Sequence, residues 1–114
     1  MTNSALHLLF VCSRNRWRSP TAERIYARAP GVASRSRGLS PNAARRLTAA
    51  DVRWADLVFV MEAEHQRRLR REFGTELEGR AVHVLDIPDD YGFMDPELVE
   101  LISSAVDPHL DASL

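Results

Sequence analysis

Short segments with the character of strands recur along this chain, and each is followed by residues with a helical pattern. Three of them, 6–11, 57–61 and 81–85, are nearly continuous apolar runs, and 32–36 is a weaker fourth. Apolar runs of this length are typical of strands buried on both faces of a sheet. Helices between such strands favour right-handed crossovers and a parallel sheet. The chain is therefore predicted to be α/β, a three-layer α/β/α domain with a four-stranded parallel sheet.

Capping residues and apolar periodicity place the helices between these strands. Ala22, Ile25, Tyr26 and Ala29 share one helical face, and Pro30-Gly31 is typical of a helix end. The predicted helices are 20–29, 48–55 with a cap at Thr48, 62–73 with Gly74 as a stop, and one that begins at 95–97; the predicted loops are 38–46 and 87–94.

The length and the cysteine count indicate one small intracellular domain. A chain of 114 residues is long enough for one core, so residues 1–114 are predicted to form a single domain. The apolar run 8–11 is too short for a signal peptide or a membrane span. A lone cysteine excludes an internal disulfide and fits a reducing compartment. We therefore expect a cytoplasmic protein without a membrane partner.

Charge is distributed unevenly although the net charge is only −1. Residues 1–50 hold nine arginines and one acid, whereas residues 51–114 hold six arginines and fifteen acids, and there is no lysine. Three of the arginines surround the cysteine, at Arg14, Arg16 and Arg18. Their concentration favours a site that attracts anions. The overall acidity and the absence of a lysine-bearing stripe argue against a nucleic-acid partner.

Cys12 stands where the first predicted strand meets a short loop, and Arg18 closes that loop as the next helix begins. Helix N-termini present free N–H groups and partial positive charge, which bind anions and favour the thiolate form of a cysteine. The guanidinium of Arg18 suits phosphate oxygens. Asp89 and Asp90 follow the fourth strand. Ligands of parallel sheets bind beyond the carboxyl ends of the strands, so these acids are predicted to lie at the same edge as Cys12.

A lone cysteine is more commonly a buried structural residue, and cysteine followed six positions later by arginine is a weak signal by itself. The context favours function: the cysteine ends a strand, Ser19 follows the arginine, and Pro20 begins a helix. The chain has no glycine-rich loop ending in Gly-Lys-Ser/Thr, which argues against a nucleotide triphosphatase.

The segment Val11–Glu23 resembles the signature of the low-molecular-weight protein tyrosine phosphatase family: Cys, five residues, Arg, Ser-Pro, then Ala-Glu, with Asn15 at the matching third place. The resemblance continues through 34–38, where Arg37 takes the place of an alanine, through 54–61 and through the aspartate loop 85–92. It thus touches most of the chain in order.

The resemblance implies a protein phosphatase that works through a phosphocysteine intermediate. The catalytic residues would be Cys12 as nucleophile, Arg18 as oxyanion binder and Asp89 as general acid and base. The phosphate would be bound by the loop residues Ser13, Arg14, Asn15, Arg16, Trp17, Arg18 and Ser19. The implied substrate is a phosphotyrosine protein or a small aryl phosphoester. No metal or cofactor is implied, because arginine and loop amides supply the positive charge.

The acid and the pocket walls depart from the family pattern. Asp90 replaces the proline that the family carries after its acid; Asp89 is preferred because it stands two residues before Tyr91, and Asp95-Pro96 is better explained as a helix cap. Trp17 and Tyr91 are candidates for the substrate pocket. The four histidines have no spacing typical of metal ligands and are interpreted as structural or surface residues.

Two further departures leave alternatives open. Trp17 occupies the place of the family's second cysteine, so a protective disulfide is impossible and oxidation of Cys12 is expected to run to sulfenic acid or to capping by an external thiol. The segment 38–56 is short, so a shallower or differently walled pocket is expected. The alternatives are a non-catalytic phosphate-binding or regulatory module and an arsenate reductase that uses an external thiol.

Overall fold

A parallel sheet of four strands forms the centre of the structure, a computed structural model that describes residues 5–113. The sheet order is β2-β1-β3-β4, with β1 (Leu6–Cys12), β2 (Val32–Gly38), β3 (Leu57–Val60) and β4 (Ala81–Val84). All three strand pairs are parallel. The predicted fold class is therefore confirmed.

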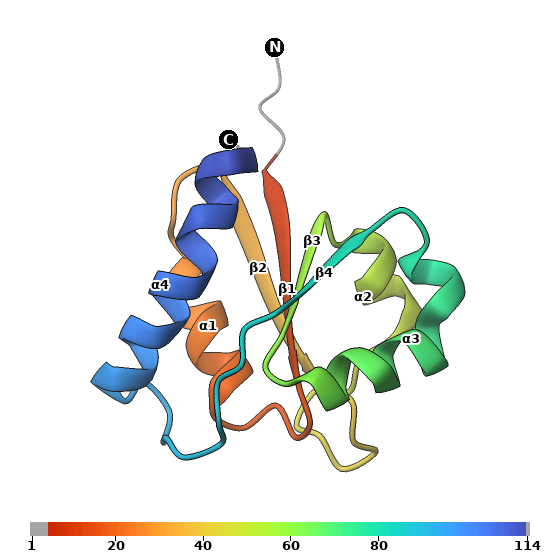
Figure 1. Ribbon diagram of the computed structural model, residues 1–114, viewed down its shortest axis with the longest axis horizontal. Coiled ribbons are helices and arrows are strands. Elements are labelled where there is room, and N and C mark those ends of the chain that lie inside the picture. Colours follow the sequence, from red (N-terminus) through yellow and green to blue (C-terminus); the bar gives the residue numbers. More distant parts are fainter. Residues whose placement is uncertain (1–4, 114) are drawn as a thin grey trace.

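Helices cover both faces of the sheet (Figure 1). They are α1 (Arg18–Tyr26), α2 (Ala49–Trp54), α3 (Ala63–Leu77) and α4 (Pro96–Ser113). Figure 1 shows α1 and α4 on one side of the strands and α2 and α3 on the other. No helix within residues 5–113 has the length and apolar character to cross a membrane.

The core lies in two layers that share the sheet. Successive side chains of a strand point to opposite faces, so Leu8 and Phe10 of β1 pack in the cluster with α1 and α4, whereas Leu9 and Val11 pack in the cluster with α2 and α3. All four side chains are completely buried. Cys12 continues the first series and is 3% exposed. Cys12 therefore lies at the carboxyl end of the central strand β1, with its thiol on the α1 side of the sheet.

Two predicted caps are confirmed, and the helix end predicted at Gly74 is wrong. Thr48 forms a reciprocal capping box with Asp51, and Asp95 accepts a hydrogen bond from the Glu97 N–H at 2.9 Å. Gly74 does not end α3, which continues to Leu77 across a kink at Phe73 (φ −131°, ψ 29°). A glycine costs a helix only about 1 kcal/mol, and burial of Leu77 in the core offsets that cost.

Three other boundaries, the end of β2 and both ends of α1, differ from those predicted. β2 runs to Gly38 rather than to Ser36, since Gly38 pairs with Cys12 in the parallel register. α1 begins at Arg18, before the predicted Pro20, and ends at Tyr26 rather than at Ala29.

Candidate active site

The segment between β1 and α1 forms a tight loop around the thiol of Cys12. The Cys12 Sγ atom lies 2.9 Å from the Ser19 hydroxyl, and the Asn15 N–H donates to it at 3.2 Å. The Ser19 hydroxyl oxygen also accepts from Asn15 Nδ2 at 2.9 Å, which leaves its own hydrogen free to point at the sulfur. The Asn15 N–H and the Ser19 hydroxyl therefore both contact the sulfur and fix its position within the loop.

Asn15 has the backbone conformation that closes this loop. Its φ is +56°, in the left-handed region that asparagine tolerates better than most residues. Its side chain is buried and links α1 to the segment after β2, because Nδ2 donates to Ser19 and Oδ1 accepts from Arg45 Nε at 3.4 Å. The turn at Asn15 directs its N–H toward Cys12 rather than outward.

The segment after β2 supports the loop from outside. The carbonyl oxygens of Cys12, Ser13 and Arg14 accept hydrogen bonds from the N–H groups of Leu39, Ser40 and Ala44, at 3.0, 2.8 and 3.1 Å. Gly38 allows this approach, since a Cβ there would lie 2.6 Å from the Ser13 carbonyl oxygen and 2.5 Å from the Ala43 Cβ. Because outward-facing carbonyls are satisfied by this segment, the loop N–H groups are left to face an anion.

The guanidinium of Arg18 is buried and held from two sides. Its Nη1 donates to the Glu62 carboxylate at 2.5 Å and to the Ile87 carbonyl oxygen at 2.8 Å, and its Nε lies 3.5 Å from Asp89 Oδ1. Within residues 5–113 its Nη2 has no hydrogen-bond partner. The hydrogen bond from Arg18 lowers the pKa of Glu62 below its usual value, so this carboxylate stays charged and fixes the arginine.

His65 lies beside this ion pair and is 5% exposed. Its Nδ1 accepts from the Glu62 N–H at 3.1 Å, so the proton of the neutral ring is on Nε2. Burial, and then the charge of Arg18, lower the pKa of His65. Neutral His65 therefore presents an N–H donor on the cavity wall at neutral pH.

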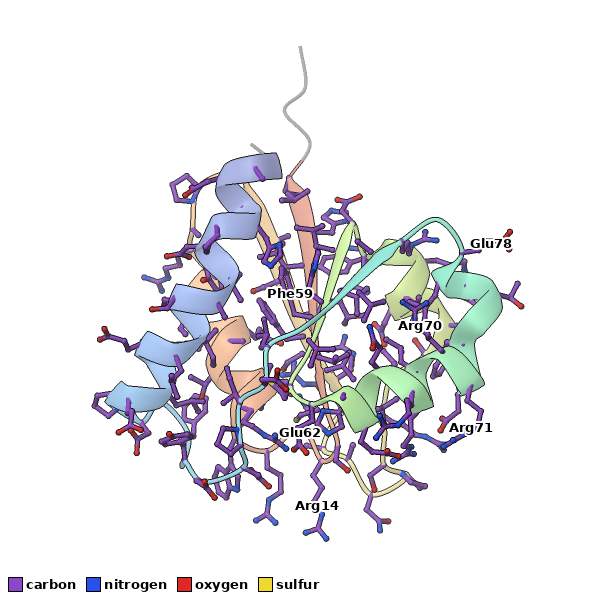
Figure 2. All side chains as sticks on the ribbon, viewed as in Figure 1. Arg14, Phe59, Glu62, Arg70, Arg71 and Glu78 are labelled. Carbon is purple, nitrogen blue, oxygen red and sulfur yellow. The ribbon has the colours of Figure 1, made fainter. Side chains whose placement is uncertain are left out.

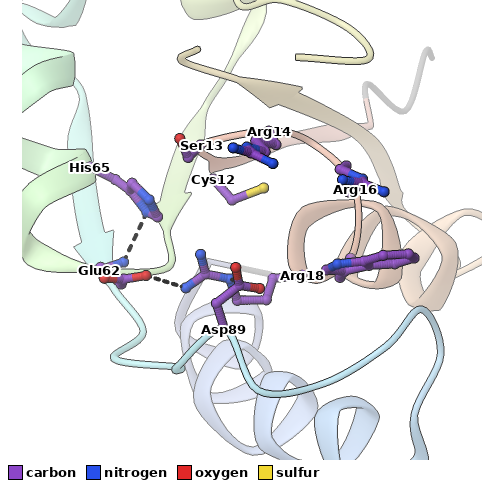
Figure 3. A pocket seen from close by; sticks show the side chains of 9 residues that line it. Cys12, Ser13, Arg14, Arg16, Arg18, Glu62, His65 and Asp89 are labelled. Atoms are coloured by element: carbon purple, nitrogen blue, oxygen red, sulfur yellow. Dashed lines mark hydrogen bonds and ion pairs between the residues drawn. The ribbon is translucent and has the colours of Figure 1, made fainter. Parts of the chain in front are cut away.

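These elements enclose a cavity of about 430 Å³ at the carboxyl edge of the sheet (Figure 3). It is lined by Cys12, Ser13, Arg14, Arg16, Trp17, Arg18, Glu62, His65 and Asp89. The lining comes from the β1–α1 loop, the start of α3 and the loop after β4. None of the lining residues comes from the short segment 38–56, which runs from the end of β2 to the start of β3.

The sequence-predicted site residues fall into three groups. Cys12, Arg18, Asp89 and most of the loop meet in the cavity, while Asn15 and Ser19 lie beneath it against the sulfur. Tyr91 does not line the cavity: its hydroxyl donates to Glu97 at 2.6 Å, and this hydrogen bond raises its pKa. Asp90 is exposed and also lies outside the lining.

Glu62 and His65 were not among the predicted site residues. Both belong to the start of α3, directly after β3, and together they form its capping box. The signal that points to them is their place after a parallel strand, since the carboxyl ends of such strands meet at one edge. His65, interpreted from the sequence as structural or surface, lies instead on the cavity wall.

Several solved structures that share this fold carry phosphatase names. The chain superposes on the tyrosine phosphatase Wzb from Escherichia coli K30 with a TM-score of 0.75 and 21% identity, covering 98% of this chain and 99% of that one. The YwlE arginine phosphatase from Geobacillus stearothermophilus gives 0.74 and 22%, covering 95% and 94%. The low-molecular-weight protein tyrosine phosphatase SP-PTP from Streptococcus pyogenes gives 0.78 and 16%, covering 96% and 93%.

The chain thus has the fold of the low-molecular-weight protein tyrosine phosphatases over nearly its whole length. No protein-family model matches it, and no curated protein sequence matches it significantly.

Proposed function

We propose that this protein is a cysteine-dependent phosphomonoester hydrolase that removes phosphate from phosphotyrosine in proteins through a phosphocysteine intermediate. The observation that carries the proposal is the convergence of the Ser19 hydroxyl and the Asn15 N–H on Cys12 Sγ, at the floor of a cavity that also holds Arg18 and Asp89. A nucleophile, an oxyanion binder and a proton donor are the three groups that this reaction requires.

In the first step, the Cys12 thiolate attacks phosphorus, an S–P bond forms, and the P–O bond to the tyrosyl oxygen breaks. Asp89 gives its proton to the leaving phenolate. The Nη2 group of Arg18 and the loop N–H groups hold the non-bridging oxygens, and Glu62 keeps the guanidinium in place for them. In the second step, water attacks phosphorus, Asp89 accepts a proton from it, and the S–P bond breaks to release phosphate and the thiolate.

Two features of the cavity mouth favour phosphotyrosine over phosphoarginine, the two substrates that the names of the neighbours suggest. Trp17 is 40% exposed on the cavity wall and offers an apolar surface to an aromatic ring. Arg14 and Arg16 stand at the same mouth, and their charge disfavours a substrate that carries a guanidinium group.

The proposal is tested with para-nitrophenyl phosphate between about pH 5 and 7, comparing the wild type with Cys12→Ser. We expect turnover that vanadate blocks and that the substitution lowers by roughly three orders of magnitude or more, as for other catalytic nucleophiles. Phosphotyrosine and phosphoarginine peptides then separate the two substrate classes. A folded wild type that binds phosphate without hydrolysing any of these phosphorylated compounds would identify a binding module instead.

A further inference from the structure

Two arginines of the β1–α1 loop, Arg14 and Arg16, have no role in the steps of the proposed reaction. Arg14 and Arg16 are exposed and line the cavity mouth. Within residues 5–113 neither side chain forms an ion pair or a hydrogen bond, although several other arginines do. Figure 2 shows Arg14 extending from the loop away from the body of the protein. Two cationic groups therefore stand at the mouth without an anionic partner.

The phosphate that reacts with Cys12 does not account for these two side chains. That phosphate has to lie against the sulfur at the cavity floor, where the Asn15 N–H points and where the buried Arg18 lines the wall. The Arg16 guanidinium instead lies over the ring of Trp17, 5.1 Å from its centroid. This cation–π contact holds the group at the rim, where it faces whatever surrounds the reacting phosphate.

The two sides of the cavity mouth also carry opposite charge. In Figure 3, Arg14 and Arg16 lie along one side of the cavity, and Asp89 lies on the other. Exposed Asp90 follows Asp89 in the chain and adds negative charge near that side. An anion beside the reacting group is therefore attracted to the loop side and repelled from the aspartate side.

We propose that Arg14 and Arg16 form a second anion-binding subsite, and that the substrate is a phosphopeptide with carboxylate side chains next to its phosphorylated residue. The proposal rests on the proposed function for the identity of the reacting group. A peptide fits better than a compact bisphosphate, because both anions of a compact molecule would enter the cavity, whereas a chain crossing the rim brings its neighbouring side chains over the two arginines.

The test measures binding without turnover. Fluorescently labelled phosphotyrosine peptides of equal length, one with glutamate and one with glutamine on both flanks, are titrated by anisotropy into Cys12→Ser protein at fixed ionic strength. Each exposed charge pair contributes modestly, so we expect the glutamate peptide to bind roughly three- to tenfold more tightly. This preference disappears when Arg14→Gln and Arg16→Gln are added.

The matched control adds Arg28→Gln and Arg70→Gln, which remove the same charge from exposed arginines outside the cavity. The preference must survive in this control. Equal affinity for the two peptides, a preference that persists without Arg14 and Arg16, a loss of equal size in the control, or no binding of either peptide would each overturn the subsite. So would equally tight binding of the glutamate peptide without phosphate, since that indicates general charge attraction.

Carboxylates and phosphates are both anions that the two arginines could bind. A third peptide, with phosphoserine on both flanks, distinguishes between them. The subsite predicts a preference for the glutamate peptide over the glutamine peptide; a preference for the phosphoserine peptide alone would overturn the carboxylate assignment. Because the readout is binding, a wild type that shows the preference but hydrolyses no aryl phosphate would overturn the proposed function and leave the subsite standing.

Discussion

The proposed reaction divides the side chains at the cavity into those that would react and those that would hold the reacting groups in place. In the proposed reaction Cys12 and Asp89 make and break bonds, while Ser19, Asn15 and Glu62 act through them or through the arginine. The distinction is physical, since only the first two can exchange a covalent bond or a proton with a substrate whose phosphorus lies over the sulfur. Their removal is therefore expected to change the rate much more than the affinity.

Neighbouring Asp89 and Asp90 give a matched pair for assigning the acid. Asp89 lines the cavity with its Oδ1 3.5 Å from Arg18 Nε, whereas Asp90 lies outside the lining. We expect Asp89→Ala to lower kcat for aryl phosphates by roughly 10²- to 10⁴-fold, the usual range for a general acid. Asp90→Ala should change it by less than about threefold. Steady-state kinetics on both variants measure this, and equal or reversed losses would contradict the assignment.

Buried His65 makes the stability of the fold depend on pH. Burial lowers the pKa of His65 in the folded state below its ordinary value of about 6.5, so the unfolded chain takes up the proton first as the solution is acidified. The contribution of His65 is complete above about pH 6.5 and is lost as the pH falls below that value toward its lowered pKa. We expect the wild type to lose more stability than His65→Gln between about pH 7 and 5.

Glutamine at this position retains the acceptor for the Glu62 N–H and removes the titrating group. Urea unfolding of both proteins at several pH values provides the comparison. The two stability curves should converge at low pH; parallel curves would show that His65 does not titrate in this range.

At the scale of elements, the conformation of the β1–α1 loop depends on its contact with the segment after β2. Three loop carbonyls accept hydrogen bonds from that segment, and a Cβ on Gly38 would lie 2.6 Å from the carbonyl oxygen of Ser13. The loop lies between a strand and a helix, so its ends are fixed by the sheet and by α1. The hydrogen bonds from the segment after β2 then set the direction in which the peptide groups of the loop point.

Gly38→Ala is expected to damage the loop without unfolding the protein. The alanine Cβ would lie 2.6 Å from the Ser13 carbonyl oxygen. This oxygen belongs to the backbone, so it cannot move aside as the end of a flexible side chain can. The cost in unfolding free energy is about 1–3 kcal/mol, together with weaker phosphate binding.

Gly74→Ala is the matched control for this substitution. A Cβ there meets nothing within 4 Å, and the residue lies in α3, so alanine should stabilise the protein by about 0.5–1 kcal/mol. Phosphate titration and urea unfolding of both variants give the two quantities. Unchanged phosphate binding in Gly38→Ala would show that the close approach does not shape the loop.

At the scale of the whole molecule, the two core layers share one sheet and are expected to unfold together. Leu69 of α3 and Ile102 of α4 are completely buried on opposite faces. Truncating either one to alanine removes buried apolar surface and leaves a cavity, at a cost of about 2–5 kcal/mol. Each substitution should lower the urea midpoint of one cooperative transition and leave its slope unchanged.

Leu101→Ala is the control for the core variants, because Leu101 neighbours Ile102 in the chain but is 38% exposed. Its cost should be less than about 1 kcal/mol. A second transition in either buried variant would mean that the two faces of the sheet unfold independently.

The sequence accounts for most of the secondary structure and for the part of the site that is local. Cys12, Asn15, Arg18 and Ser19 lie within one short segment, so the geometry that joins them follows from a strand, a turn and a helix in succession. The parallel sheet also follows, because apolar runs that alternate with helices have few ways to pack. Helix ends were less predictable: the stop assigned to Gly74 failed because burial of Leu77 outweighs one glycine.

Only the tertiary structure decided which distant side chains complete the cavity. Arg18 and Glu62 are 44 positions apart in the chain, and their contact exists because β1 and β3 are neighbours in the sheet. The same packing puts Asp89 in the cavity and turns Tyr91 toward Glu97. Local sequence determines elements, since helix and strand depend on near neighbours and on apolar periodicity; the site depends on register and side-chain direction across the sheet, which are settled when the whole core packs.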